Sequence, residues 1–194
     1  MRALYPGRFQ PFHLSHLKRV QEIIQRYPDH NFFIGVADWK GKKNKANFLS
    51  GDEASEIATI SLRDGGIEGV QVLKVELRPD RSLVDCLGDA IQMHDIGSIF
   101  SGSSSTLEAA RVISNHKELV IHNWDDNEKG VRSTDIRDWI IADDARWINE
   151  VTPSAAEFLR NPLYRKRLIA LAEGIKRPWT LDGEVNSSRG ERRY

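Results

Sequence analysis

The chain has 194 residues, which suits one sizeable domain with at most a short appendage. Its 28 Lys and Arg residues balance its 28 Asp and Glu residues, so bulk electrostatic binding of nucleic acid or of a membrane surface is not expected. No apolar run approaches the length of a membrane span, and the chain starts with a strand pattern instead of a signal peptide. The single cysteine, Cys86, excludes an intramolecular disulfide framework and fits a cytoplasmic location.

Short apolar runs alternate with amphipathic helical patterns along the first 150 residues. The run at 2–5 is typical of a buried strand, and the apolar residues after it recur at helical spacing until Pro28 ends the pattern. The same reasoning predicts strands at 2–5, 31–37, 70–76, 96–100 and 119–122, with helices at 14–27, 50–64, 82–91, 107–113 and 133–140. Ser133 or Thr134 is expected to cap the last of these helices.

Five strand-to-helix alternations predict a doubly wound α/β fold, in which helices cover both faces of a five-stranded parallel sheet. Past Pro153 the pattern is helical again through Leu171, and 177–194 is polar. We therefore expect an α/β domain at 1–150 and a C-terminal helical appendage with a polar tail at 151–194. Cys86 lies in an apolar helical pattern and is expected to be buried.

The stretch from Tyr5 to His16 joins the first strand to the first helix. The helix start presents outward-pointing backbone N–H groups, and its dipole favours negative charge. Arg8, His13 and His16 add side-chain donors at the same end. The stretch therefore predicts a polyphosphate site. The two histidines could instead be metal ligands or simply cap and pack the helix, but no matched Cys, Asp or Glu lies near them in the sequence.

A second anion site is predicted at Ser133, Thr134 and Arg137, where a helix start, two hydroxyls and a guanidinium would converge; an ordinary cap followed by a surface arginine is the alternative. The turn from Gly102 to Ser105 follows the fourth strand, and its small residues would let a nucleoside approach the backbone. If the first and fourth strands are neighbours, the turns after them face one crevice.

The segment from Asp38 to Phe48 is a long polar loop. Its lysines are either a solvated surface or a mobile lid that neutralises a triphosphate and contacts the acceptor substrate. These lysines are Lys40, Lys42, Lys43 and Lys45.

The sequence GRFQPFHLSH at 7–16 resembles the GxFxPxHxGH signature of the nucleotidyltransferase superfamily, also called cytidylyltransferase-like, and is closest to the archaeal-type nicotinamide-mononucleotide adenylyltransferases. RSTDIR at 132–137 is similar to the second signature of that superfamily. The resemblance covers about residues 1–150. It implies a Rossmann-like sheet with strand order 3-2-1-4-5 and in-line transfer of a nucleoside monophosphate, with Mg²⁺ carried by the triphosphate and no protein metal ligands.

The resemblance also implies roles for individual residues. His13 and His16 would stabilise the transition state together with Arg137, which with Ser133 and Thr134 would hold the β- and γ-phosphates. The remaining nucleotide- and phosphate-binding residues would be Gly7, Arg8, Phe9, Gly102 and Arg132.

The sequence departs from the family pattern at Ser15, which replaces a glycine, and after Gly35, where the arginines of the archaeal-type enzymes are missing. The predicted reaction is transfer of AMP from ATP to a small phosphorylated acceptor, with nicotinamide mononucleotide leading and NAD and pyrophosphate as products. The alternatives are a cytidylyltransferase or an adenylyltransferase that acts on another acceptor such as an alditol phosphate, and a nucleotide-binding regulator without turnover. The expected partners are ATP and that acceptor, without nucleic acid or membrane, and a homo-oligomer is possible.

Overall fold

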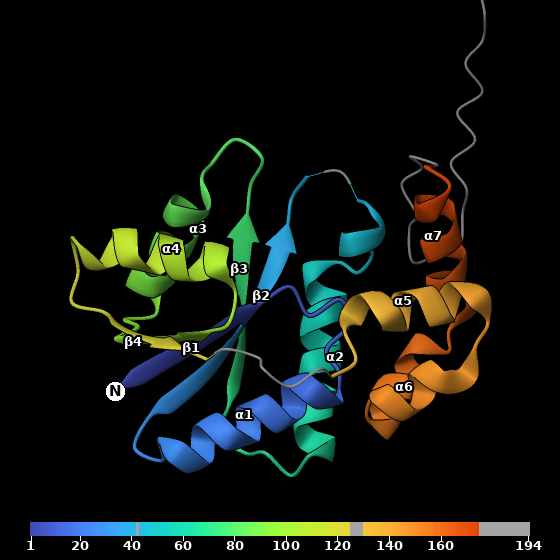
Figure 1. Cartoon of the computed structure of the whole chain (residues 1–194), viewed down its shortest axis with the longest axis horizontal. Coiled ribbons are helices and arrows are strands. Elements are labelled where there is room, and N and C mark those ends of the chain that lie inside the picture. Colours follow the sequence, from blue (N-terminus) through green and yellow to red (C-terminus); the bar gives the residue numbers. More distant parts are fainter. Residues whose placement is uncertain (42, 125–129, 175–194) are drawn as a thin grey trace, which may run out of the picture.

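A computed structural model describes residues 1–41, 43–124 and 130–174 (Figure 1). Its five strands form one parallel sheet in the order β3-β2-β1-β4-β5, which confirms the order implied by the family resemblance. The strands are β1 (Arg2–Gly7), β2 (Asn31–Trp39), β3 (Gln71–Leu77), β4 (Ser98–Ser101) and β5 (Val120–Asn123). The helices are α1 (Leu14–Arg26), α2 (Gly51–Asp64), α3 (Leu83–Met93), α4 (Ser104–Ser114), α5 (Ser133–Ala142), α6 (Pro153–Leu159) and α7 (Pro162–Ala172), with 3-10 turns η1 (Lys45–Asn47) and η2 (Ala145–Glu150).

Alternating side chains of the strands build a core on each face of the sheet. On β1, Leu4 packs with the buried faces of α3 and α4, whereas Ala3 and the partly buried Tyr5 pack toward α1. On β2, Ile34 and Val36 pack with α1, α2 and the C-terminal helices in the largest cluster. Cys86 is on the buried face of α3, as expected.

The register of the central strands aligns the two turns that the sequence singles out. Leu4 of β1 lies opposite Ile99 of β4, and the two strands are parallel neighbours. Both turns therefore leave the carboxyl edge of the sheet from neighbouring strands, where α/β proteins bind ligands.

Three local predictions are wrong. The helix expected from Pro153 to Leu171 is two helices, because the side chain of Asn161 caps a new start at Leu163 N–H (3.0 Å) and Pro162 occupies its first turn. The cap of α5 is Arg132, not Ser133 or Thr134. The fourth and fifth strands begin later than expected, at Ser98 and Val120.

The C-terminal helices pack beside α2 and α5 at one side of the sheet (Figure 1). The domain boundary near residue 150 stays a prediction. Among the helices of the described residues, none combines the length and the hydrophobicity that a membrane span requires.

Candidate active site

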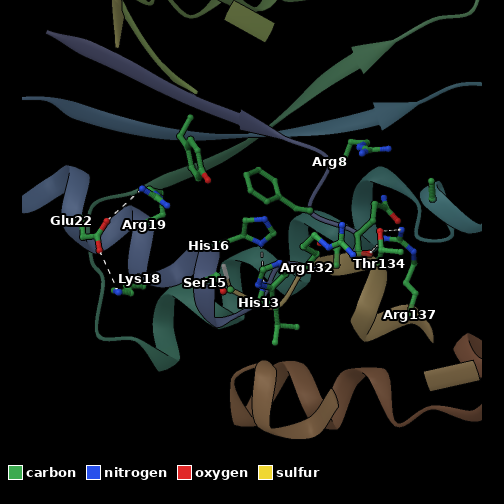
Figure 2. Close-up of a pocket in the computed structure, with 17 residues that line it drawn as sticks. Arg8, His13, Ser15, His16, Lys18, Arg19, Glu22, Arg132, Thr134 and Arg137 are labelled. Carbon is green, nitrogen blue, oxygen red and sulfur yellow. Dashed lines mark hydrogen bonds and ion pairs between the residues drawn. The ribbon is translucent and has the colours of Figure 1, made fainter. Parts of the chain in front are cut away.

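A cavity of about 650 Å³ opens at the carboxyl edge of the sheet, between the turn after β1 and the start of α5. Figure 2 shows Lys18, Arg19 and Glu22 at one end, Arg8 and Arg137 at the other, and the two histidines between them. The lining residues are Tyr5, Arg8, Phe9, Gln10, His13, Ser15, His16, Lys18, Arg19, Glu22, Ala46, Gly130, Val131, Arg132, Ser133, Thr134 and Arg137. Among the described residues that line it, arginines and lysines far outnumber carboxylates, which suits a polyanionic ligand.

The turn after β1 is shaped by an aromatic side chain that folds back over glycine. Phe9 has φ of +47°, in the left-handed region, and its ring packs over Gly7. A Cβ on Gly7 would lie 2.6 Å from Cζ of Phe9, so a larger residue there would have to displace the ring. The Phe9 ring also meets the His16 ring edge-on, with the centroids 5.0 Å apart. This packing supports the histidine from behind.

The two histidines form a coupled pair at the start of α1. Nδ1 of His16 accepts the backbone N–H of His13 at 3.2 Å, and the two ring centroids are 3.8 Å apart. Burial lowers the pKa of His13 to about 4, although the charge of Asp135 works in the opposite direction. Burial, followed by the charges of His13 and Arg19, holds the pKa of His16 well below its usual range.

Both imidazoles are therefore neutral near pH 7. Because Nδ1 of His16 is an acceptor, the proton of its neutral ring is on Nε2. That N–H is a hydrogen-bond donor that carries no net charge. Among the described residues, no group of three or more His, Cys, Asp and Glu side chains is arranged to hold a metal ion.

Arg137 forms the opposite wall and is only 7% exposed. Its Nη1 donates to the backbone carbonyl of Gln10 (2.7 Å) and its Nη2 to the hydroxyl of Thr134 (3.0 Å), while its buried Nε has no partner. Within the described part of the chain neither Arg137 nor Arg8 has a carboxylate within salt-bridge distance. Burial, with a smaller contribution from Arg8, lowers the pKa of Arg137. A buried guanidinium without a carboxylate partner is suited to binding an anionic ligand.

The start of α5 is joined directly to the turn after β1. The hydroxyl of Ser133 donates to the carbonyl of Pro11 at 3.1 Å, which explains why Ser133 does not cap its own helix. The carboxylate of Asp135 accepts the N–H of Arg132 at 2.9 Å instead and pairs with its guanidinium at 3.2 Å. The first backbone hydrogen bond within α5 runs from the N–H of Ile136 to the carbonyl of Arg132. The N–H groups before Ile136 have no such backbone partner in the helix, and Ser133 and Thr134 of this first turn line the cavity.

The structure brings most of the predicted site residues into one cavity. The predicted residues that line it are Arg8, Phe9, His13, His16, Arg132, Ser133, Thr134 and Arg137. Gly7 lies directly behind the Phe9 ring. Gly102 is exposed at the neighbouring turn and does not line the cavity.

Lys40, Lys43 and Lys45, the loop lysines that the structure describes, lie outside the lining. Lys40 pairs with Asp38 (2.6 Å), Lys43 donates to the carbonyl of Leu49 (2.6 Å), and Lys45 pairs with Asp138. Lys42 is outside the described residues.

Sequence reasoning assigned no role to Gln10 or to the polar side of α1, although both line the cavity. Ser15, Lys18 and Glu22 recur at helical spacing on one face of α1, continuing from His16, and this periodicity was the available signal. Glu22 lies 3.9 Å from Lys18 and 3.8 Å from Arg19. The role of Gln10 left no local signal, because its partners are distant in the chain.

No family model matches the chain. Curated relatives do match along most of its length. It is 28% identical over 163 residues to nicotinamide-nucleotide adenylyltransferase 1 of Sulfolobus acidocaldarius, which covers 83% of this chain and 90% of the relative. It is 25% identical to the nicotinamide-nucleotide adenylyltransferase of Pyrobaculum aerophilum, over 92% of this chain and 99% of the relative. These matches along most of both chains support assignment to the nucleotidyltransferase superfamily.

Solved structures with 17–19% identity share the fold of this chain. A bifunctional NMN adenylyltransferase/ADP ribose pyrophosphatase from Francisella tularensis superposes with a TM-score of 0.67 over 89% of this chain. The chain spans 53% of that bifunctional protein. A putative nicotinate-nucleotide adenylyltransferase from Vibrio parahaemolyticus gives a TM-score of 0.58, with 85% of this chain and 95% of that one covered.

Proposed function

We propose that the protein transfers AMP from ATP to nicotinamide mononucleotide, forming NAD and pyrophosphate. The observation that carries this proposal is the cavity with two neutral histidines on one wall and, on the other, a buried Arg137 that has no carboxylate partner among the described residues. The names of the full-length archaeal relatives support the choice of both substrates.

The chemistry is a direct in-line displacement. A phosphate oxygen of the acceptor attacks the α-phosphorus of ATP, a new P–O bond forms, and the bond to the bridging oxygen of the β-phosphate breaks to release pyrophosphate. The histidine N–H groups donate to the α-phosphoryl oxygens, whose charge develops in the transition state. Arg137 and the start of α5 hold the leaving pyrophosphate. Neutral histidines need not transfer a proton for this role.

Mg²⁺ accompanies ATP in this proposal. A structure of the Francisella protein contains AMP and a manganese ion, which supports a divalent metal in this proposal. Among the residues that the structure describes, Glu22 is the one carboxylate in the cavity lining, and it lies beside Lys18 and Arg19. This donor set fits a metal held by phosphate oxygens and water, as Mg²⁺ prefers. Bound there, it would neutralise phosphate charge.

A pyrophosphate-release assay tests the proposal. ATP or CTP is supplied with nicotinamide mononucleotide, nicotinate mononucleotide or glycerol phosphate, with Mg²⁺ present and His16→Ala as the control enzyme. We expect pyrophosphate and NAD in equal amounts from ATP and nicotinamide mononucleotide, and loss of both on addition of a chelator. Measurable ATP binding without pyrophosphate from any pair of substrates would contradict catalysis. Turnover only with CTP or glycerol phosphate would contradict the assigned substrates.

A further inference from the structure

Arg167 lies on α7, far along the sequence from most residues that line the cavity. It is buried, and hydrogen bonds connect it to the cavity wall. Its Nη1 donates to the carboxylate of Glu53 at 2.7 Å and to the backbone carbonyl of Phe48 at 3.1 Å. Its guanidinium also lies 5.4 Å from the centre of the Tyr164 ring. Arg167 does not line the cavity itself.

Glu53 has a second function in this contact. The same carboxylate oxygen that accepts from Arg167 also accepts the backbone N–H of Ser50 at 2.7 Å, which completes the capping box at the start of α2. Both side chains of the pair are less than a tenth exposed. The position of the helix start is therefore tied to α7 by a charge pair that is shielded from solvent.

Three successive residues of the backbone are held as a result. The carbonyl of Phe48 is held by Arg167 and the N–H of Ser50 by Glu53. Between them, the N–H of Leu49 donates to Oε1 of Gln10 (2.9 Å), and Nε2 of Gln10 donates back to the carbonyl of Leu49 (3.4 Å).

Gln10 is where this support meets the active site. It is a buried residue in the cavity wall, and its own backbone carbonyl accepts the 2.7 Å hydrogen bond from Arg137. A continuous set of contacts thus runs from α7 through residues 48–50 to the guanidinium that we assign to the phosphates. The lysine loop enters the same segment, and its Ala46 lines the cavity.

We propose that Arg167 is a positioning residue for adenylyl transfer: with Glu53 it fixes residues 48–50 and through Gln10 sets the place of Arg137. This inference rests on the proposed function. It makes the C-terminal helix a part of the active-site support. Small displacements of a phosphate-holding group lower the rate strongly, because the reacting atoms must be aligned.

The test compares Arg167→Met with Arg167→Lys, Glu53→Gln and the control Arg165→Met in the full-length protein. Arg165 lies on the same helix but donates to the carbonyls of Ile140 and Ile141 at the far end of α5. We expect Arg167→Met to raise KM for ATP and lower kcat, with a combined loss of about tenfold or more in kcat/KM. Lysine at 167 should restore most of it, and Arg165→Met should leave both constants near wild type.

Amide hydrogen exchange at Leu49 gives a second measurement that needs no turnover. The N–H of Leu49 donates the hydrogen bond to Gln10, so loosening of residues 48–50 exposes it to exchange. Exchange at this amide should therefore be faster in Arg167→Met and Glu53→Gln than in Arg165→Met. If Arg167→Met does not fold, Glu53→Gln, which keeps an oxygen for the cap, decides the matter. Wild-type kinetics and wild-type Leu49 exchange in the folded variants would overturn the positioning role. A wild-type enzyme without pyrophosphate release would instead overturn the proposed function, and ATP affinity and Leu49 exchange would then test the coupling alone.

Discussion

Replacing Arg137 by Met should remove activity while leaving stability almost unchanged. The residue is 7% exposed, and its guanidinium makes two hydrogen bonds within the protein, to Gln10 and Thr134. Hydrogen bonds of a charged group contribute about 1.5–3 kcal/mol each, so these two stabilise the fold by about 3–6 kcal/mol. The opposing terms must be set against this value.

Two costs oppose those bonds. Burial of a guanidinium without a counter-ion costs several kcal/mol, and the unsatisfied Nε adds about 1–3 kcal/mol. The two sides are of similar size, and methionine fills much of the same volume without a polar atom. The arginine is therefore retained at little net benefit to the free protein, as expected for a group whose partner is a ligand.

Arg167 is the matched comparison, because it is also 7% exposed but is paired with Glu53. Arg167→Met leaves a buried carboxylate without its cation, which costs about 3–5 kcal/mol. Urea unfolding of both variants measures this difference directly. In the pyrophosphate assay Arg137→Met should lose at least about a hundredfold in kcat/KM for ATP, equal to about 2.7 kcal/mol. If Arg137→Met is as destabilised as Arg167→Met, the reasoning that Arg137 awaits an anion is refuted.

Three further predictions concern the turn after β1 and the start of α1. The pKa of His13 is about 4 in the folded protein against 6.5 in the unfolded chain. Between these two pH values the unfolded state binds a proton that the folded state does not bind. The free energy of unfolding therefore falls by about 3 kcal/mol as the pH drops from 6.5 to 4. His13→Gln should reduce the slope of this part of the profile in urea unfolding, and the slope that remains belongs to His16, whose pKa is also lowered by burial; an unchanged slope would assign the whole loss to other groups. His16→Ala should lower kcat by about a hundredfold or more with little change in KM for ATP, whereas an effect on KM alone would make His16 a ground-state binder. Gly7→Ala brings a methyl group within 2.6 Å of the Phe9 ring and should cost about 1–3 kcal/mol in thermal unfolding; an unchanged Tm would show that the ring moves aside freely.

Local sequence determined the elements and their order. Apolar periodicity was sufficient for the five strands and the helices between them, because each strand must bury alternate side chains and each helix one face. The capping boxes at Ser50 and Ser82 are also local, since the groups involved are only three residues apart. The break between α6 and α7 was also present in the sequence, at Asn161 and Pro162, but the continuing apolar pattern obscured it.

Tertiary structure decided which polar groups meet and in which charge state. Arg137 meets the carbonyl of Gln10 across 127 positions, and Arg167 meets Glu53 across 114, so neither contact has a signature within a local window. The motif at 7–16 indicated that the histidines face phosphate, but their neutrality follows from burial, which only the packed chain supplies. Likewise the lysine loop could be identified as basic from its composition, whereas the ion pairs and carbonyls that its described lysines bind depend on folding. Hydrophobic periodicity is a property of neighbouring residues, while desolvation and ion pairing are properties of the assembled fold.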